Sequence, residues 1–99
     1  MEYYVIADDD TVLGFSIVGV SGEAVHSREE CMEAWKRVLE DRKYGVIIIT
    51  EDKADLIRET VDRYLFSESF PLVVEIPERG GGFRRDLREL VNEAIGVSI

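Results

Sequence analysis

A run of β-branched residues in the middle of the chain limits what this sequence can fold into. Residues 45–50 read Gly-Val-Ile-Ile-Ile-Thr, so consecutive large apolar side chains leave no polar face. A strand with one side in water alternates apolar and polar residues, whereas an unbroken run is typical of a strand covered on both faces. Helices on both faces of a parallel sheet provide that cover, and the run therefore indicates an α/β fold.

Strand patterns alternate with helical patterns along the chain. Strands are predicted at residues 2–8, 23–26, 45–50 and 72–76. Helices are predicted at residues 11–20, after the capping box Ser27–Glu30, at 53–66 and at 83–99. Strands that alternate with helices pair in parallel through right-handed crossovers. The expected fold is a flavodoxin-like or receiver-like, four-stranded parallel sheet in the order 2-1-3-4, flanked by helices and followed by a C-terminal helix.

Two of these helices have one apolar and one polar face. The helix after Ser27 carries its apolar face on Cys31, Trp35, Val38 and Leu39. The helix at 53–66 carries charged pairs four residues apart on its polar face, Arg58 with Asp62 and Glu59 with Arg63. Both helices are therefore expected to cover the sheet with one side only.

The helix at 11–20 has no polar face. Its apolar residues point all round the axis and are Val12, Leu13, Phe15, Ile17, Val18 and Val20. A helix that covers a small sheet normally presents a polar face to water. Two interpretations stay open: neighbouring elements bury this helix on both sides, or part of it meets another protein.

A triple glycine divides the chain near its end. Gly80–Gly82 permits many backbone conformations, so the expected units are an α/β domain at 1–77, a hinge at 78–82 and a helical tail at 83–99. The apolar stripe of the tail consists of Leu87, Leu90, Val91, Ala94 and Ile95. We expect this stripe to pack on the fourth strand in one state and to leave it in another.

The balance of charge excludes several classes of function. Twenty-one Asp and Glu against twelve Lys and Arg give a net charge of −9, and such a surface repels nucleic-acid phosphates and anionic lipids. The first residues lack the basic and apolar segments of a signal peptide, and no apolar run nears the ~20 residues that cross a bilayer. We expect a cytoplasmic protein with no nucleic-acid partner and no inserted membrane segment.

Three aspartates follow the first predicted strand. Asp8–Asp10 lie where parallel sheets bind ligands, and receiver domains hold magnesium with acidic residues at this place. A receiver also needs a phosphoacceptor aspartate at the end of the third strand, where this chain has Thr50 and Glu51. Aspartates at a helix start also stabilise the helix as caps. Capping is favoured, and the alternative is a magnesium pocket in a degenerate receiver-like signalling domain.

Other motifs do not assemble a catalytic site. The triple glycine lacks the lysine and hydroxyl of a phosphate-binding loop. The one histidine, His26, and the one cysteine, Cys31, have no arrangement for nucleophilic catalysis and cannot build a zinc cluster. We therefore expect no catalytic residue, no metal ligand and no cofactor, and we expect Cys31 to lie in the core.

Four segments together resemble the F subunit of the V-type and A-type rotary ATP synthases. They are Val5–Phe15, Gly45–Glu51, Pro71–Pro77 and Val91–Ile99. None of these segments is specific alone, but they span nearly the whole chain in the order found in the family. The chain departs from the family at Ser16, where arginine is common, and at Ala7, where glycine is usual.

The resemblance implies a subunit of the central rotor stalk without an active site. Such a subunit docks on the coiled-coil D-type subunit, works beside the catalytic A and B subunits, transmits rotation and modulates ATP hydrolysis. It belongs to the peripheral part of a membrane-bound complex. The residues expected at the partner interface are Phe15, Arg58, Arg63, Phe66, Leu90 and Ile95. Phe66 and Phe70 are expected either to anchor the partner or to close the bottom of the core.

Overall fold

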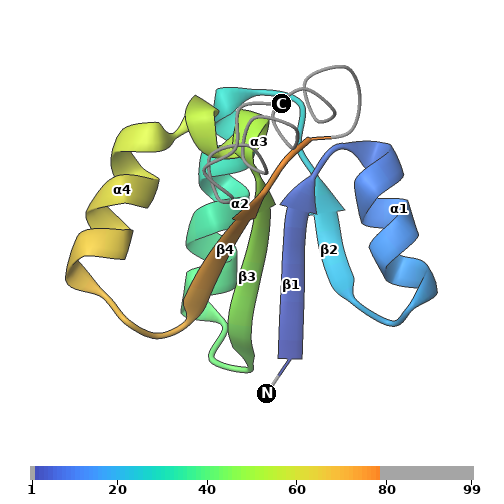
Figure 1. The fold of residues 1–99 in the computed structure, drawn as a ribbon, viewed down its shortest axis with the longest axis horizontal. Helices are drawn as coiled ribbons and strands as arrows, with labels where there is room; N and C mark the ends of the chain where they lie inside the picture. Colours follow the sequence, from blue (N-terminus) through green and yellow to red (C-terminus); the bar gives the residue numbers. More distant parts are fainter. Residues whose placement is uncertain (1, 79–99) are drawn as a thin grey trace, which may run out of the picture.

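Strands and helices alternate along the chain (Figure 1). The computed structural model describes residues 2–78, so most of the predicted glycine hinge and the whole predicted tail lie outside the described residues. In chain order the elements are β1 (Glu2–Ala7), α1 (Asp9–Ile17), β2 (Ser21–Ala24), α2 (Arg28–Glu40), β3 (Tyr44–Thr50), α3 (Glu51–Leu56), α4 (Arg58–Ser67) and β4 (Leu72–Ile76).

The four strands pair in parallel in the order β2-β1-β3-β4, which confirms the predicted fold class. β2 is the strand whose bounds differ most from the expected range 23–26. It begins earlier, because Ser21 and Gly22 pair with Tyr4 and Val5 of β1 although neither residue type favours strands. The sheet pairing therefore decides where this strand begins.

The glycine in β2 permits a close approach to β1. A Cβ added to Gly22 would lie 2.6 Å from the carbonyl oxygen of Val5 and would also overlap the Val5 side chain. Atoms in folded proteins do not pack at that distance, so the pairing of β1 with β2 depends on the missing side chain at position 22.

The core lies on the face of the sheet that α2, α3 and α4 cover. Ile6, Ile47 and Ile49 have no exposed surface, and they belong to one cluster with Trp35 of α2 and Val61 of α4. Burial of side chains of this size contributes about 1.5–3 kcal/mol each, so this face supplies most of the stability of the domain.

α2 begins at the predicted cap, with one difference in the contacts. The Ser27 hydroxyl accepts a hydrogen bond from the Glu30 amide at 3.1 Å. The Glu30 carboxylate reaches back to the amide of His26 at 2.9 Å, one residue before the position that a capping box uses. Cys31 is buried in the core, as predicted, and its thiol donates to the carbonyl oxygen of Lys53 at 3.3 Å.

The single helix predicted at 53–66 is two helices. The backbone leaves helical geometry at Ile57, where φ is −128° and ψ is 36°. The break places the Ile57 side chain in the core with 3% of its surface exposed, and it brings Arg58 to Glu75 on β4. Both predicted surface pairs are present, Arg58 with Asp62 at 3.2 Å and Glu59 with Arg63 at 3.7 Å.

The opposite face of the sheet is only partly covered by described elements. Right-handed crossovers place α1 on the face opposite α2, and α1 packs against β1 and β2. Figure 1 shows α1 beside β2 at one edge and α4 beside β4 at the other. Side chains on the β3–β4 half of the α1 face stay open, with Leu72 56% and Val74 38% exposed. We call this half the open half-face; it consists of Val46, Ile48, Leu72, Val74 and Ile76.

Candidate docking surfaces

The aspartates after β1 act at the start of α1. Asp8 is the N-cap residue, and its carboxylate accepts hydrogen bonds from the amide and the hydroxyl of Thr11. The hydrogen bond from the Thr11 hydroxyl is the main cause that holds the pKa of Asp8 below its ordinary value. The predicted capping role is therefore confirmed for Asp8.

Asp9 joins α1 to the loop before α2. Its carboxylate lies 2.7 Å from Nε2 of His26, and a carboxylate oxygen of Glu30 lies 3.3 Å from Nδ1 of the same ring. Asp9, and more weakly Glu30, raise the pKa of His26. Between residues 2 and 78 the structure contains no group of three or more histidine, cysteine or acidic side chains placed to hold a metal ion.

α1 carries the first of two apolar surfaces. Among its nine described residues none is buried, so the interpretation that neighbours bury this helix on both sides is wrong for the described part of the chain. Leu13 is 62% exposed and Ile17 is 79% exposed, one helical turn apart, and Val18 follows at 74%. Phe15, a predicted interface residue, is half-buried beside them.

A groove runs along the inner side of this helix. It has a volume of about 400 Å³ and lies between α1 and the end of β4. We call it the α1 groove; its apolar lining includes Gly14, Phe15, Val18, Ile76 and Pro77. The groove adjoins the open half-face, because Ile76 belongs to both.

The second apolar surface lies at the other edge of the sheet, around the end of α4. Phe66 is 95% exposed and Phe70 is 62% exposed, so the expectation that these rings close the bottom of the core is wrong. Leu65 adds further exposed apolar area. We call these three residues the α4 corner.

The two arginines predicted for the interface differ in their surroundings. The Arg58 guanidinium binds Asp55, Asp62 and both carboxylate oxygens of Glu75. These carboxylates, Glu75 above all, raise its pKa, and they hold the side chain within the domain. Arg63 extends into solvent, with 69% of its side chain exposed. Arg63 is therefore the better placed of the two for contact with a partner.

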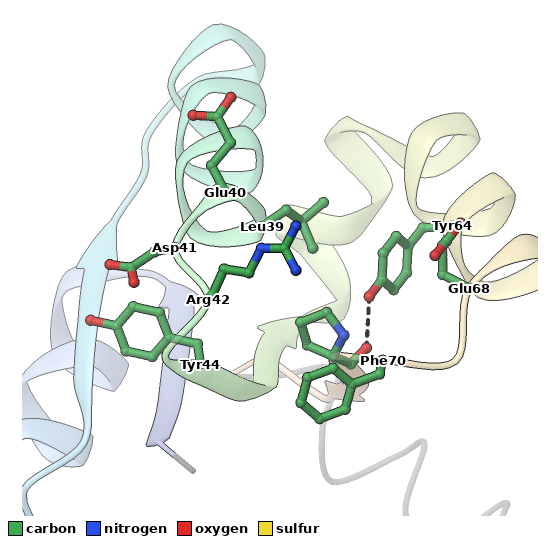
Figure 2. A pocket seen from close by; sticks show the side chains of 9 residues that line it. Leu39, Glu40, Asp41, Arg42, Tyr44, Tyr64, Glu68 and Phe70 are labelled. Carbon is green, nitrogen blue, oxygen red and sulfur yellow. Dashed lines mark hydrogen bonds between the residues drawn. The ribbon is translucent and has the colours of Figure 1, made fainter.

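Figure 2 shows a pocket that no pattern in the sequence predicts. It has a volume of about 530 Å³ and lies between the last turns of α2 and α4, at the edge of the sheet where β3 and β4 begin. We call it the α2–α4 pocket; it is lined by Leu39, Arg42, Tyr44, Tyr64, Glu68 and Phe70, among others. Residues 39–44 and 64–71 meet only through the topology, so no spacing in the sequence marks the pocket.

Comparison with known proteins identifies the family. The family model for the ATP synthase (F/14-kDa) subunit matches residues 4–95 of the chain. The chain belongs to the family of ATP synthase F subunits. The resemblance stated from the four sequence segments is thereby confirmed.

The relatives of this chain include F subunits of both A-type and V-type ATP synthases. The A-type ATP synthase F subunit of Methanosphaera stadtmanae is 34% identical over 99 residues, which cover 96% of this chain and 92% of that protein. The V-type ATP synthase F subunit of Fusobacterium nucleatum is 37% identical over 98 residues, which cover 96% and 91%. The crystal structure of the V-type ATP synthase F subunit of Archaeoglobus fulgidus superposes with a TM-score of 0.60 and 26% identity, over 76% of this chain and 95% of that chain.

Family membership directs attention to surfaces rather than to a catalytic centre. The chain is a subunit of an ATP synthase of the V- or A-type, and a subunit needs contact areas for its neighbours. Phe15 and Phe66 lie on or beside the two apolar surfaces described above, whereas Leu90 and Ile95 lie outside the described residues. No helix within residues 2–78 has the length and apolar character needed to cross a membrane.

Proposed function

We propose that this F subunit is a non-catalytic component of the central stalk, that it binds the coiled-coil D-type subunit, and that it transmits rotation and modulates ATP hydrolysis. The observation that carries the proposal is the solvent-exposed apolar ridge of α1, formed by Leu13 and Ile17 with Val18 beside them. Contiguous exposed apolar patches, as distinct from scattered single residues, are typical of protein interfaces.

The spacing of the ridge residues is suited to contact with a helical partner. Leu13 and Ile17 are four residues apart on one side of a helix, the spacing with which helices pack against each other. A coiled coil offers apolar residues at the same spacing along its length. A small number of such residues supplies most of the binding energy in an interface of this kind.

Transmission of rotation requires a domain that does not deform under load. Hydrogen-bonded strands and the buried cluster around Ile47 and Ile49 hold the centre of the sheet. Arg58 ties the α3–α4 junction to β4. These contacts support a role as a rigid attachment to the stalk, and the catalytic A and B subunits are the neighbours on which the proposed modulation of hydrolysis acts.

The tail has a place to bind within the same domain. Pro77 lines the α1 groove, so residues 83–99 begin only a few positions from it. A helix of 17 residues measures roughly 25 Å, enough to run the length of the open half-face. We infer that the stripe containing Leu90 and Ile95 covers this surface in the free subunit and exchanges it for the partner in the assembled stalk.

Co-purification with the D-type subunit tests the proposal. The expected result is a stable complex with the unmodified chain and a loss of complex with the pair Leu13→Asp and Ile17→Asp, because carboxylates at those positions would be buried against the partner. The matched control is Glu29→Gln and Glu33→Gln, which alters exposed charge on α2 and leaves binding unchanged. A complex that survives the α1 pair would show that this ridge is not the contact.

A further inference from the structure

The α2–α4 pocket has an aromatic wall, and one of its rings, Tyr64, is held in place by contacts within the chain. The Tyr64 hydroxyl donates to the carbonyl oxygen of Pro71 at 2.8 Å, and the ring meets Trp35 edge-on with 5.5 Å between centroids. Figure 2 shows Phe70 and Tyr64 on the same side of the pocket, with Tyr44 across from them. The ammonium group of Lys43 lies 5.2 Å from the centre of the Tyr44 ring, so one ring at this site already holds a cation at its face.

The rim of the pocket is negative. Glu40, Asp41 and Glu68 line it, against the guanidinium of Arg42 alone among its described lining residues. Neither Glu40 nor Glu68 forms an ion pair with any other residue between positions 2 and 78. Burial is the main cause that raises the pKa of Tyr64, and the negative charge of Glu68 is the second cause.

The ends of two helices add to this charge. α2 and α4 both finish at the pocket, and the free carbonyl groups at a helix end carry partial negative charge. α4 has no basic residue in its last turn. The basic residue in the last turn of α2, Arg37, binds Glu23 on β2 instead.

One guanidinium group of the chain, that of Arg42, already lines the α2–α4 pocket. In Figure 2 its side chain lies beside Leu39, between α2 and the aromatic wall. Within the described part of the chain it forms no ion pair through its side chain. It is therefore a weakly held cation within the chain itself, and it can move aside for another.

We propose that the α2–α4 pocket receives an arginine or lysine side chain presented by a protein partner. The aromatic wall contacts the alkyl and guanidinium part, and Glu68 pairs with the charge. An acidic side chain would meet Arg42 and the nearby Lys43, but it would face three carboxylates. The net charge of −9 on the whole chain also favours a basic partner over an acidic one.

An amide-resolved NMR titration of the full chain tests the proposal without any assembly partner. The probe is N-acetyl-arginine amide, and its neutral match is N-acetyl-citrulline amide. The arginine probe is expected to shift the amide signals of Tyr64, Glu68 and Phe70, and the citrulline probe is expected to leave them in place. Equal shifts with both probes, or none with either, would overturn the proposal.

Three variants locate the binding group. Glu68→Gln is expected to weaken the arginine probe about two- to fivefold, the factor that one exposed ionic or cation–π contact contributes. Arg42→Ala is expected to strengthen it, because the competing guanidinium is gone. Glu59→Gln, a highly exposed position on α4 away from the pocket, is the control and is expected to leave the affinity for the probe unchanged.

If N-acetyl-glutamate amide binds instead and Arg42→Ala abolishes that binding, the pocket recognises carboxylates and the proposal is wrong. The D-type co-purification does not enter this test, so the two proposals fail independently.

Discussion

Arg58 and Glu75 form a two-point ion pair between α4 and β4. Nη1 and Nη2 of the guanidinium lie 2.7 Å and 2.9 Å from the two carboxylate oxygens. The same guanidinium holds Asp55 before the helix break and Asp62 after it. One side chain thus fixes α3, α4 and the edge strand relative to one another.

Loss of that side chain should destabilise the domain. We expect Arg58→Ala to lower the free energy of unfolding by about 1–2 kcal/mol, because a bidentate pair is strong but the group is partly open to solvent. Urea unfolding followed by circular dichroism measures the change. Arg63→Ala is the control, with an expected effect within about 0.5 kcal/mol. Equal effects of the two substitutions would show that the contact to Glu75 adds no stability.

Two glycines should respond oppositely to the same substitution. Gly22→Ala is expected to lower the free energy of unfolding by about 1–3 kcal/mol, because the new methyl group would overlap Val5. Gly14→Ala is expected to add about 0.5–1 kcal/mol, because no atom lies within 4 Å of its added Cβ and alanine favours the helix. Thermal unfolding of both variants checks the signs. A stabilised Gly22→Ala variant would contradict the close approach of β1 and β2.

The His26 contacts should give this ring a raised pKa. An NMR titration of the ring protons is expected to show a value above the ordinary 6.5. Because the folded value is the higher one, the contacts add stability below the unfolded pKa and lose it as pH rises through the folded pKa. Asp9→Asn should move the pKa back towards its ordinary value. Glu33→Gln should not move it, and an unshifted wild-type ring would show that the Asp9 contact does not form in solution.

Removal of the tail should expose the open half-face. A chain truncated after Pro77 is expected to stay folded, to lose stability and to bind more of the dye ANS than the full chain. In an assembled ATP synthase it should alter the coupling of hydrolysis to rotation more than assembly. The full-length pair Leu90→Asp and Ile95→Asp should reproduce the dye binding, and Glu89→Gln with Glu93→Gln should not. Unchanged dye binding after truncation would contradict the proposed contact of the tail.

The strand pattern was readable in the sequence because β3 is apolar on both sides. Right-handed crossovers alone allow more than one strand order, so the order 2-1-3-4 rests on the flavodoxin-like or receiver-like type of fold that the alternating pattern indicates. The break at Ile57 was not readable, because residues 53–66 keep a helical spacing of apolar side chains on both sides of it. The break becomes visible only in the fold, where it accompanies the burial of Ile57 and the contact of Arg58 with Glu75 on β4.

The candidate surfaces also combine features that the sequence predicts with features that only the fold reveals. The apolar character of α1 was visible in the sequence, but its exposure depended on which elements pack beside it. The sequence predicts Arg58 at the partner interface, and only the fold brings Glu75 within reach of it. The α2–α4 pocket joins two loops that are distant in sequence, so its aromatic wall and its carboxylates could not be associated in advance.

No side chain of the described α1 helix is buried. Substitutions in this helix can therefore be tested separately for their effect on folding and for their effect on assembly. Substitutions at Leu13, Ile17 and Val18 cost the isolated fold little, since these side chains already face water. Under the proposed function, we expect their identity to depend on the neighbouring subunit rather than on the core. A library randomised at these three positions should pass a screen for folded protein with many sequences and a screen for assembly with few, and the difference between the two outcomes would read out the chemistry of the neighbour directly.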